Sequence, residues 1–593
     1  MTIPTKDNPA TAQPPLESRP HRRLSPSNRL ILCGLLSWFC YLAVACGARS
    51  LHESSPQGHG LLGLLALFGM AFGLSLVALR LALRLPDDRR LLIILWTGAI
   101  AFRVPLLLCD PIEEIDLYRY VWDGAVSNCG ISPFRYTPQQ VLAVSADDPL
   151  PADLARLVRL RDASPELKEV LGRIHFGELP TIYPPVSQVI FAACSWFTPA
   201  HSSVARRLML MKSWFTVFDL LTLALVIRLL RLVNRHRGGA FAYGWCPLVV
   251  KEIANSGHLD ALAVYLTILA VTWTLLALNE KDHTRRCLRL SLGAGLLLAL
   301  GVGAKLYPVV LAPLLFGALI RGTSWKIGLA ALAVFGLATL VALWPICPKN
   351  MAEESNAFDE SAVVLRSDAD PPLPPSEIST ATRDPSESLR AFLSRWEMND
   401  FLFLLVIENL RPSDGLVAHQ VAWFTVTPET WRSSLVSLVA TRSGVAADSV
   451  PFILTRTFLS LAFLILACGL ALWAEPQTTG EIANHSATRL LEAAFLTLAW
   501  FWLLLPTQNP WYLVWCLPLL PFARHRAWLA LSGLAFCYYL RFWLTSLFPT
   551  PLLGTPYSGP QFFDYIVTWM EFGPWFVWLM WGRSSVGHEG SGP

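Results

Sequence analysis

Residues 91–109 have the sequence LLIILWTGAIAFRVPLLLC, and residues 110–124 continue as DPIEEIDLYRYVWDG. A helix rises about 1.5 Å per residue, so the first run is long enough to cross the roughly 30 Å hydrocarbon core of a bilayer. We therefore expect the carboxylates that follow it where the chain leaves the membrane, beside the lipid headgroups. An enzyme that acts on a lipid-borne substrate needs a general base at that depth.

The composition of the whole chain extends this expectation. Its 593 residues are 53% hydrophobic and 15% charged, with a mean hydropathy of +0.45, whereas soluble proteins carry about 25% charged residues. The 23 Trp residues fit aromatic belts at the membrane interfaces. The 12 Cys residues show no CxxC spacing, which indicates neither a zinc site nor a disulfide framework. We predict an all-α polytopic membrane protein.

Hydropathy predicts a bundle of about 13–15 transmembrane helices with two large loops. The predicted spans lie near 30–48, 60–79, 91–109, 208–230, 240–256, 259–279, 288–304, 306–320, 327–347, 452–474, 488–505, 510–523, 527–547 and 563–581. The predicted organisation is a disordered cytoplasmic tail (1–28), two N-terminal helices (29–90), a catalytic membrane module (91–347) with an outer loop (110–182), a second outer loop (348–450), C-terminal helices (451–581) and a cytoplasmic tail (582–593).

The distribution of charge predicts the orientation in the membrane. Arginine-rich segments between spans, such as 228–237 and 524–526, are expected in the cytoplasm, and the two acidic loops are expected outside it. Residues 183–199 are apolar, but a crossing there would place Arg235 and Arg237 outside. We therefore expect an interfacial or re-entrant helix at 183–199, and helical stretches within the charged segment 151–173.

The first candidate chemical cluster is Asp116, Arg119 and Asp123. A carboxylate can deprotonate a hydroxyl, and a guanidinium can hold a phosphate through two hydrogen bonds. Asp116 and Arg119 are three residues apart, so on a helix they can meet. The alternative is a solvated acidic turn at the membrane surface, which the charge pattern alone favours.

Three further clusters are expected on the same face. Lys251, Glu252, His258 and Asp260 lie between two apolar runs, where ionisable residues seldom persist without a partner or a task. The alternative is an internal set of ion pairs. Lys305 follows a Gly-rich break and could neutralise a phosphate or extend toward the interface. Asn509 precedes a Pro-Trp-Tyr segment, which we interpret first as the ordinary start of a helix and second as a ligand contact. His258 and Asp260 suit a metal, but no third ligand is identifiable, so we predict no metal site.

The order of these motifs resembles that of bacterial GT-C polyprenyl-phosphate-dependent glycosyltransferases, specifically the group with polyprenyl-phosphate-mannose α-mannosyltransferases. The run Asp116–Gly124 and then GISPFRY at 130–136 are similar to the family pattern D-x-Y-R-Y-x-W-D-G … G-I-N-P-Y. The other matching segments are YPP at 183–185, WCPL at 245–248, GHLD at 257–260, KLYP at 305–308, WEMN at 396–399 and NPWY at 509–512. Ser132 and Cys246 stand where the pattern has Asn, which bears on the choice of acceptor or sugar more than on the reaction class.

The resemblance, which covers about residues 90–580, implies a GT-C-like fold and an inverting transfer of a hexose, with mannose the expected sugar. The donor would be a polyprenyl-phosphate sugar, and the acceptor a lipid or a glycan at the outer face of a bacterial inner membrane. Asp116 would be the general base, and Lys305, His258 and Arg119 would contact the donor phosphate. The implied substrate-binding residues are Asp123, Tyr183, Glu252, Asp260, Asn399 and Asn509. No nucleotide-binding Gly-rich loop is visible, and we expect no cofactor and no nucleic-acid partner. The alternative is a lipid or solute transporter, which would place its ionisable residues near the bilayer midplane, often in repeats.

Overall fold

The computed structural model describes residues 25–53, 59–280, 284–347, 380–413, 421–474, 481–552 and 554–581. Within these ranges every regular element is helical, and the one β-type pairing is an isolated parallel bridge between Met398 and Thr507. The predicted all-α class is therefore confirmed. The predicted tail residues 1–24 and 582–593, and residues 348–379 of the second loop, lie outside the described residues. The first helix begins at Pro26, so the end of the predicted N-terminal tail is helical.

Nine helices of the described part are long and apolar enough to cross a membrane. At about 1.5 Å per residue, each covers roughly 30 Å or more. They are Pro26–Ala48, Gly60–Ala82, Arg89–Leu108, Asp260–Asn279, Thr284–Ala304, Trp325–Ile346, Ala447–Trp473, His485–Leu504 and Ala527–Leu547. The chain is thus an integral, polytopic membrane protein.

Five other predicted spans have a different form. Residues 208–230 belong to a long helix, α9 (Val204–Leu232), which is not among the nine. The segment 306–320 forms η3 (Tyr307–Leu311) and α14 (Ala312–Gly322), and 563–581 forms η11 (Phe563–Val567) and α25 (Thr568–Trp581). The spans at 240–256 and 510–523 are not continuous helices, because prolines interrupt them. Their pieces are η1 (Arg237–Ala240), α10 (Phe241–Gly244), α11 (Pro247–Val249), η2 (Val250–Asn255), α21 (Pro510–Leu513) and η9 (Leu517–Phe522). In the described ranges, the helices that are both long enough and apolar enough to span a membrane are therefore fewer than the 13–15 predicted.

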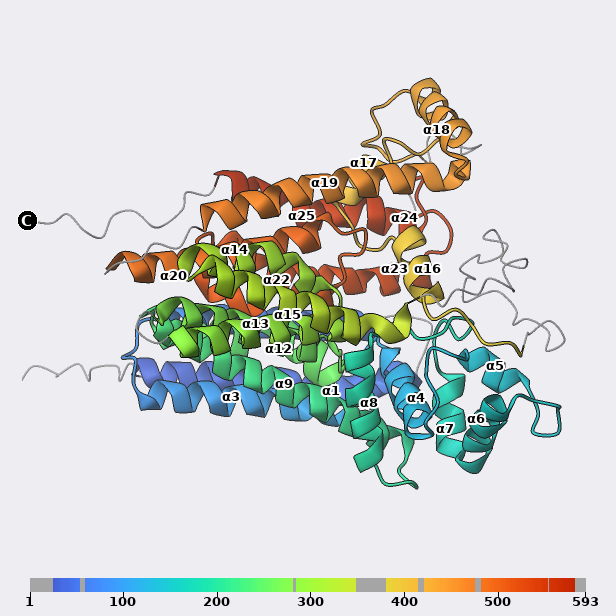
Figure 1. Ribbon diagram of the computed structural model, residues 1–593, viewed down its shortest axis with the longest axis horizontal. Coiled ribbons are helices and arrows are strands. Elements are labelled where there is room, and N and C mark those ends of the chain that lie inside the picture. Colours follow the sequence, from blue (N-terminus) through green and yellow to red (C-terminus); the bar gives the residue numbers. More distant parts are fainter. Residues whose placement is uncertain are drawn as a thin grey trace, which may run out of the picture.

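The long helices form one bundle (Figure 1). Packed neighbours include α1 with α2 and α3, α9 with α12, α13 with α12 and α15, and α19 with α14 and α20. Their bounds are α1 Pro26–Glu53, α2 His59–Ala82, α3 Arg89–Leu108, α12 Asp260–Asn279, α13 Thr284–Ala304, α15 Trp325–Leu343, α19 Val450–Trp473 and α20 Glu481–Leu504. The bundle is completed by α22 (Ala527–Leu534), η10 (Ala535–Tyr539), α23 (Leu540–Leu547) and α24 (Gly559–Phe562).

The shorter helices gather at one end of the bundle, which we call the loop end (Figure 1). They are α4 Asp116–Asn128, α5 Pro138–Ala143, α6 Ala152–Ala163, α7 Pro165–Gly172, α8 Pro185–Phe197, α16 Glu387–Arg395, α17 Leu402–Ile407 and α18 Glu429–Ser443. Helices α6 and α7 confirm the helical stretches predicted in 151–173. Helix α8 has 13 residues, about 20 Å, too short to cross a bilayer alone, as expected for an interfacial or re-entrant segment.

The two loop regions touch each other at this end. Ser388 Oγ donates to the carbonyl of Pro180 at 2.5 Å, and Gln140 Nε2 donates to the carbonyl of Ala381 at 2.9 Å. Within the first region, α4 packs closely on α8, because a Cβ on Gly124 would lie 2.3 Å from the carbonyl oxygen of Phe191. The glycine therefore fixes how near α4 comes to α8.

The opposite end of the bundle gathers arginines from distant segments. Arg237 pairs with Asp87 at 2.5 Å, and Arg524 pairs with Glu492 at 2.7 Å. Arg235 donates to the carbonyl of Pro521 at 3.0 Å. Since α3 runs from Arg89 to Leu108, these arginines lie a full helix length from Asp116. The basic segments expected on one side of the membrane therefore do share one end.

Candidate functional site

Asp116 is the first residue of α4 and is held by a tightly bonded turn. Glu114 Oε1 accepts hydrogen bonds from the backbone N–H groups of Asp116 at 2.7 Å and Ile115 at 3.0 Å. Upstream, Asn255 ties the turn to η2: its Oδ1 accepts from the N–H of Ile112 at 2.9 Å, and its Nδ2 donates to the carbonyl of Asp110 at 3.0 Å. A carboxylate at a helix N-terminus is favoured by the helix dipole, and the turn fixes the Asp116 position.

His258 lies between two carboxylates beside Asp116. Its Nε2 is 3.0 Å from Glu114 Oε2 and 3.3 Å from Glu252 Oε2, and its side chain is 1% exposed. The chain reaches this point through Gly257, whose φ of +67° lies in the left-handed region and whose Cβ would come within 2.8 Å of Leu117. The indole of Trp511 stacks on the imidazole with ring centroids 4.5 Å apart.

The surroundings of Asp116 and His258 move the pKa values of the two side chains apart. Burial, followed by the charge of Glu114, raises the pKa of Asp116 to about 6, against the opposing effects of His258, a hydrogen bond from Tyr183, and Lys305. Burial lowers the pKa of His258, but Glu114 and Glu252 outweigh it and raise that pKa to about 10. At neutral pH Asp116 is thus a carboxylate able to accept a proton, and His258 is a cation. Two groups whose pKa values are pushed apart in this way suit an acid–base site.

The π-helical element η2 carries Glu252, the second carboxylate beside His258, and holds it through buried hydrogen bonds. Tyr539 donates to Glu252 Oε1 at 2.6 Å, and Lys251 donates to Ser256 Oγ at 2.8 Å and to the Tyr539 hydroxyl. Lys251 and Glu252 are almost fully buried, with Nζ and Oε2 3.6 Å apart. Because π-helical turns widen the helix and often occur at functional sites, η2 explains how two adjacent ionisable side chains fit inside the bundle.

Lys305 forms the other side of the site. Its Nζ lies 3.4 Å from Asp260 Oδ2, while Asp260 Oδ1 accepts from Trp515 Nε1 at 2.6 Å. The ammonium group also lies 4.9 Å from the ring centroid of Tyr512 and 5.9 Å from that of Tyr183. The Lys305 side chain is 18% exposed whereas that of Asp260 is fully buried. Lys305 can therefore approach an anion from solvent while Asp260 holds its position.

The structure brings together most of the predicted site residues. Asp116, His258, Glu252, Asp260, Lys305 and Tyr183 form a connected group, which we call the base–cation group, although they span almost 190 positions of sequence. A carboxylate, two cations and aromatic rings can in combination deprotonate a hydroxyl and stabilise a phosphate.

Arg119 and Asp123 pair with each other and connect α4 to its surroundings. Arg119 donates to the carbonyl of Leu179 at 2.7 Å and pairs with Asp123 at 3.3 Å rather than with Asp116. Asp123 in turn accepts from Gln188 Nε2 of α8 at 3.1 Å. These contacts give both residues a role in positioning α4.

Asn399 and Asn509 join the second loop region to the bundle. Asn399 Nδ2 donates to the carbonyl of Gln508 at 3.0 Å, and the carbonyl of Asn509 accepts from Trp502 Nε1 at 3.0 Å. Both residues are buried, and the side-chain oxygens of both lack a hydrogen-bond partner within the described residues. They border the base–cation group through Trp511 rather than belong to it.

Three members of the site were missed at the sequence level. Glu114 was not among the predicted site residues, yet it pairs directly with His258. Tyr539 and Trp515 lie inside apolar runs, and no sequence pattern links them to Glu252 and Asp260, which are 287 and 255 positions away. The one sequence signal for these three residues was the position of Glu114, a carboxylate two residues before the predicted base Asp116.

Glu114 also forms, with Asp116 and His258, a set of possible metal ligands that the sequence did not identify and that leaves out Asp260. One atom each of Glu114, Asp116 and His258 lie within 4.8 Å of one another, a spacing that a divalent ion can bridge. Such an ion needs neutral imidazole as a ligand, and a proton on His258 competes with it. The three residues thus form either a metal site or a hydrogen-bonded ionic group, and the high pKa of His258 favours the second.

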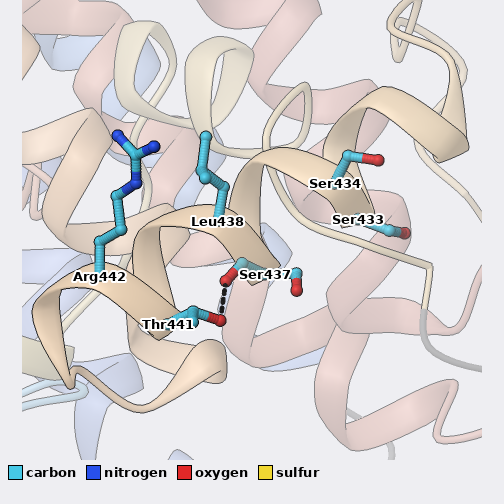
Figure 2. Close-up of a pocket in the computed structure, with 6 residues that line it drawn as sticks. All are labelled: Ser433, Ser434, Ser437, Leu438, Thr441 and Arg442. Atoms are coloured by element: carbon cyan, nitrogen blue, oxygen red, sulfur yellow. Dashed lines mark hydrogen bonds between the residues drawn. The ribbon is translucent and has the colours of Figure 1, made fainter.

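A separate hollow lies on α18, away from these residues. It is lined by Ser433, Ser434, Ser437, Leu438, Thr441 and Arg442 (Figure 2). Thr441 Oγ1 is already bonded to the carbonyl of Ser437 at 2.7 Å, and Figure 1 places α18 at the edge of the loop end, far from α4. None of the residues that line the hollow is a base that could activate these hydroxyls.

Comparison of the chain with family models, with curated proteins and with solved structures found no match in any of the three.

Proposed function

We propose that this protein is an integral membrane glycosyltransferase that uses a polyprenyl-phosphate-linked hexose, with mannose the expected sugar, and transfers it to a lipid or glycan acceptor on the extracytoplasmic face. The observation that carries the proposal is the half-buried Asp116 carboxylate, with its pKa raised to about 6, placed beside two cations, His258 and Lys305, at one end of a membrane bundle. The motif order that resembles the GT-C enzymes adds to it.

In the proposed reaction Asp116 accepts the proton of an acceptor hydroxyl. The oxygen attacks the anomeric carbon, the new C–O bond forms as the bond from that carbon to the phosphate oxygen breaks, and the configuration inverts. The polyprenyl phosphate leaves with the bonding electron pair, and Lys305 and His258 stabilise its charge. Because a phosphate monoester is a stable leaving group, no second carboxylic acid is required, in contrast to glycoside hydrolysis.

The placement of charge supports the proposed side. The arginines of segments 235–237 and 524–526 gather at the end of the bundle opposite Asp116, and positive loops prefer the cytoplasm. The base–cation group would then face the outer leaflet. Its members lie where helices begin or end: Asp116 opens α4, Asp260 opens α12 and Lys305 follows α13. A transporter would be expected to hold its coupling residues near the midplane instead.

The test is donor use by the purified protein in proteoliposomes. Polyprenyl phosphates carrying mannose, glucose or galactose are supplied one at a time, and release of free polyprenyl phosphate is measured with and without an alkyl glycoside acceptor. We expect release from one donor, dependent on the acceptor. Flux of intact donor across the membrane without release from any of them would instead support the transporter.

A further inference from the structure

A second group of ionisable residues lies beside the base–cation group and has no part in the proposed transfer step. It comprises Glu397, Asp400, Glu408 and Asp564, with Arg411 and Arg541, and we call it the outer acidic cluster. Arg411 binds both oxygens of Glu397 at 3.0 Å and Glu408 Oε1 at 2.7 Å, and Arg541 pairs with Asp564. Four carboxyl groups therefore face two guanidinium groups, and even with Asp400 uncharged the other three carboxylates outnumber the cations.

Asp400 is the member that forms no ion pair in the described part of the chain. It is 6% exposed, and its Oδ2 has no hydrogen-bond partner within the described residues. Burial, together with the charges of Glu397 and Asp564, raises its pKa well above the usual value. Leaving a buried polar oxygen unpaired is unfavourable, so this oxygen points to a ligand that completes the cluster. Glu397, Asp564 and both arginines are partly exposed, so solvent reaches the group.

Tyr538 links this cluster to the base. Its hydroxyl donates to Met398 Sδ at 3.1 Å, next to Glu397, and its ring centroid lies 5.8 Å from that of Trp511, which stacks on His258. The Tyr538 hydroxyl is within electrostatic reach of both Asp116 and Arg541. The outer acidic cluster thus borders the base–cation group on the side formed by the second loop region, whereas Lys305 lies with Asp260 and Tyr183.

The charge and spacing of the cluster select among ligands. Excess carboxylate repels a phosphate. A single cation is also a poor match, because within the described residues the one set of ligand atoms that converges within 4.8 Å is Glu114, Asp116 and His258. Separated carboxylates accept hydrogen bonds from separate hydroxyl groups, as on a sugar ring. Trp396 adds a half-buried indole whose buried Nε1 has no hydrogen-bond partner among the residues that the structure describes. Its ring centroid lies 4.9 Å from that of Phe176, and such an aromatic face suits packing against the C–H face of a sugar.

We propose that the outer acidic cluster is the acceptor site, and that the acceptor presents neutral sugar hydroxyls rather than a charged lipid headgroup. This inference rests on the proposed function, whose acceptor it narrows from a lipid or glycan to a glycan. The sugar lies between Asp400 and Trp396, and one of its hydroxyls reaches past Tyr538 to Asp116.

The test uses octyl α-mannoside and its 6-phosphate as probes. Binding to the purified full-length protein is measured by calorimetry with polyprenyl phosphate present, and transfer is measured separately. We expect the neutral probe to bind and the phosphorylated probe to bind at least about tenfold more weakly, since like charges repel. Glu397→Gln should weaken binding of the neutral probe by about tenfold, the effect of one hydrogen bond to a charged group. Asp400→Asn should weaken it by a smaller factor, because burial favours the uncharged form of Asp400, and both variants should leave the donor KM unchanged. Asp448→Asn, an exposed aspartate outside the cluster, is the matched control.

The outcomes separate this inference from the proposed function. Equal binding of both probes, or binding that neither variant weakens, overturns the acceptor site even if donor turnover persists. Loss of binding in Glu397→Gln with an unchanged melting temperature supports the site if Asp400→Asn does not fold. Selective binding of the neutral probe without release of polyprenyl phosphate from any donor would support the sugar site while contradicting the transferase.

Discussion

Two ionic groups in this protein contrast in how far they reach toward solvent. Deep in the bundle, Arg103 pairs with Asp219 at 2.5 Å, Tyr243 donates to the other Asp219 oxygen at 2.6 Å, and Arg103 also donates to the carbonyls of Ala99 and Gly244. Both oxygens of Asp219 are used, and the pair is closed to solvent. In the base–cation group, Asp116 is half-buried and Lys305 is 18% exposed.

This difference distinguishes an ionic group that only stabilises helix packing from one that can also bind a ligand. Both groups put charge where hydropathy argues against it, and such residues mark a function or an internal pairing. A closed pair can only stabilise the arrangement of helices. A group whose carboxylate and ammonium reach toward solvent from helix ends can also receive a ligand. The predictions that follow test this contrast.

The largest expected effect is on catalysis. Asp116→Asn should lower the kcat of transfer by about 10²–10⁴-fold, the usual contribution of a general base, because an amide cannot take the acceptor proton. The melting temperature should stay near that of the wild type. The matched control is Asp153→Asn on α6, where the aspartate is partly exposed and pairs with Arg135. Turnover near normal in Asp116→Asn proteoliposomes would contradict the role.

Asp219→Asn should have the reverse profile. Removing one partner leaves the buried Arg103 charge uncompensated, at a cost of about 3–5 kcal/mol. We expect a much lower melting temperature in detergent and little change in kcat per folded molecule. If instead the variant melts like the wild type and loses turnover, the Arg103–Asp219 pair has a role beyond stabilising the bundle.

Lys305→Met should act on the donor. A charge-assisted hydrogen bond to phosphate contributes about 1.5–3 kcal/mol, so the affinity for polyprenyl phosphate should fall by about 10–100-fold while acceptor binding stays the same. Lys326→Met, at an exposed lysine on α15, is the control. If Lys305→Met binds the donor with unchanged affinity, then Lys305 only pairs with Asp260 and does not contact the donor phosphate.

Chelation should have the smallest effect. With His258 protonated and Lys305 supplying charge, treatment with EDTA is expected to change the transfer rate by no more than about twofold, because the proton competes with metal for the imidazole. A loss of activity that Mn²⁺ restores would show that Glu114, Asp116 and His258 hold an ion.

The sequence predicted the helical class, most of the spans and the convergence of Asp116, His258 and Lys305, because apolar length and charge placement are one-dimensional signals. It did not predict which carboxylates turn inward. Glu113 adopts a φ of +48° and is exposed, whereas the neighbouring Glu114 reaches His258. That choice depends on the bonds from Asn255, which lies about 140 positions away.

The same limit explains Arg119 and the broken spans. Helical spacing allows Arg119 to meet either Asp116 or Asp123, and the carbonyl of Leu179 decides between them. Hydropathy likewise counts the prolines in 240–256 and 510–523 as parts of apolar runs, although they interrupt the helices. Tertiary partners, rather than local pattern, determine these features.

The most direct test of the central claim is the pH dependence of transfer. A base whose pKa is raised to about 6 is protonated and inactive below that value. We therefore predict that kcat/KM falls about tenfold per pH unit below pH 6 and is level from pH 7 to 8, since this profile reports the free enzyme. An acid limb near pH 4, or none, would contradict Asp116 as the base between Glu114, His258 and Lys305.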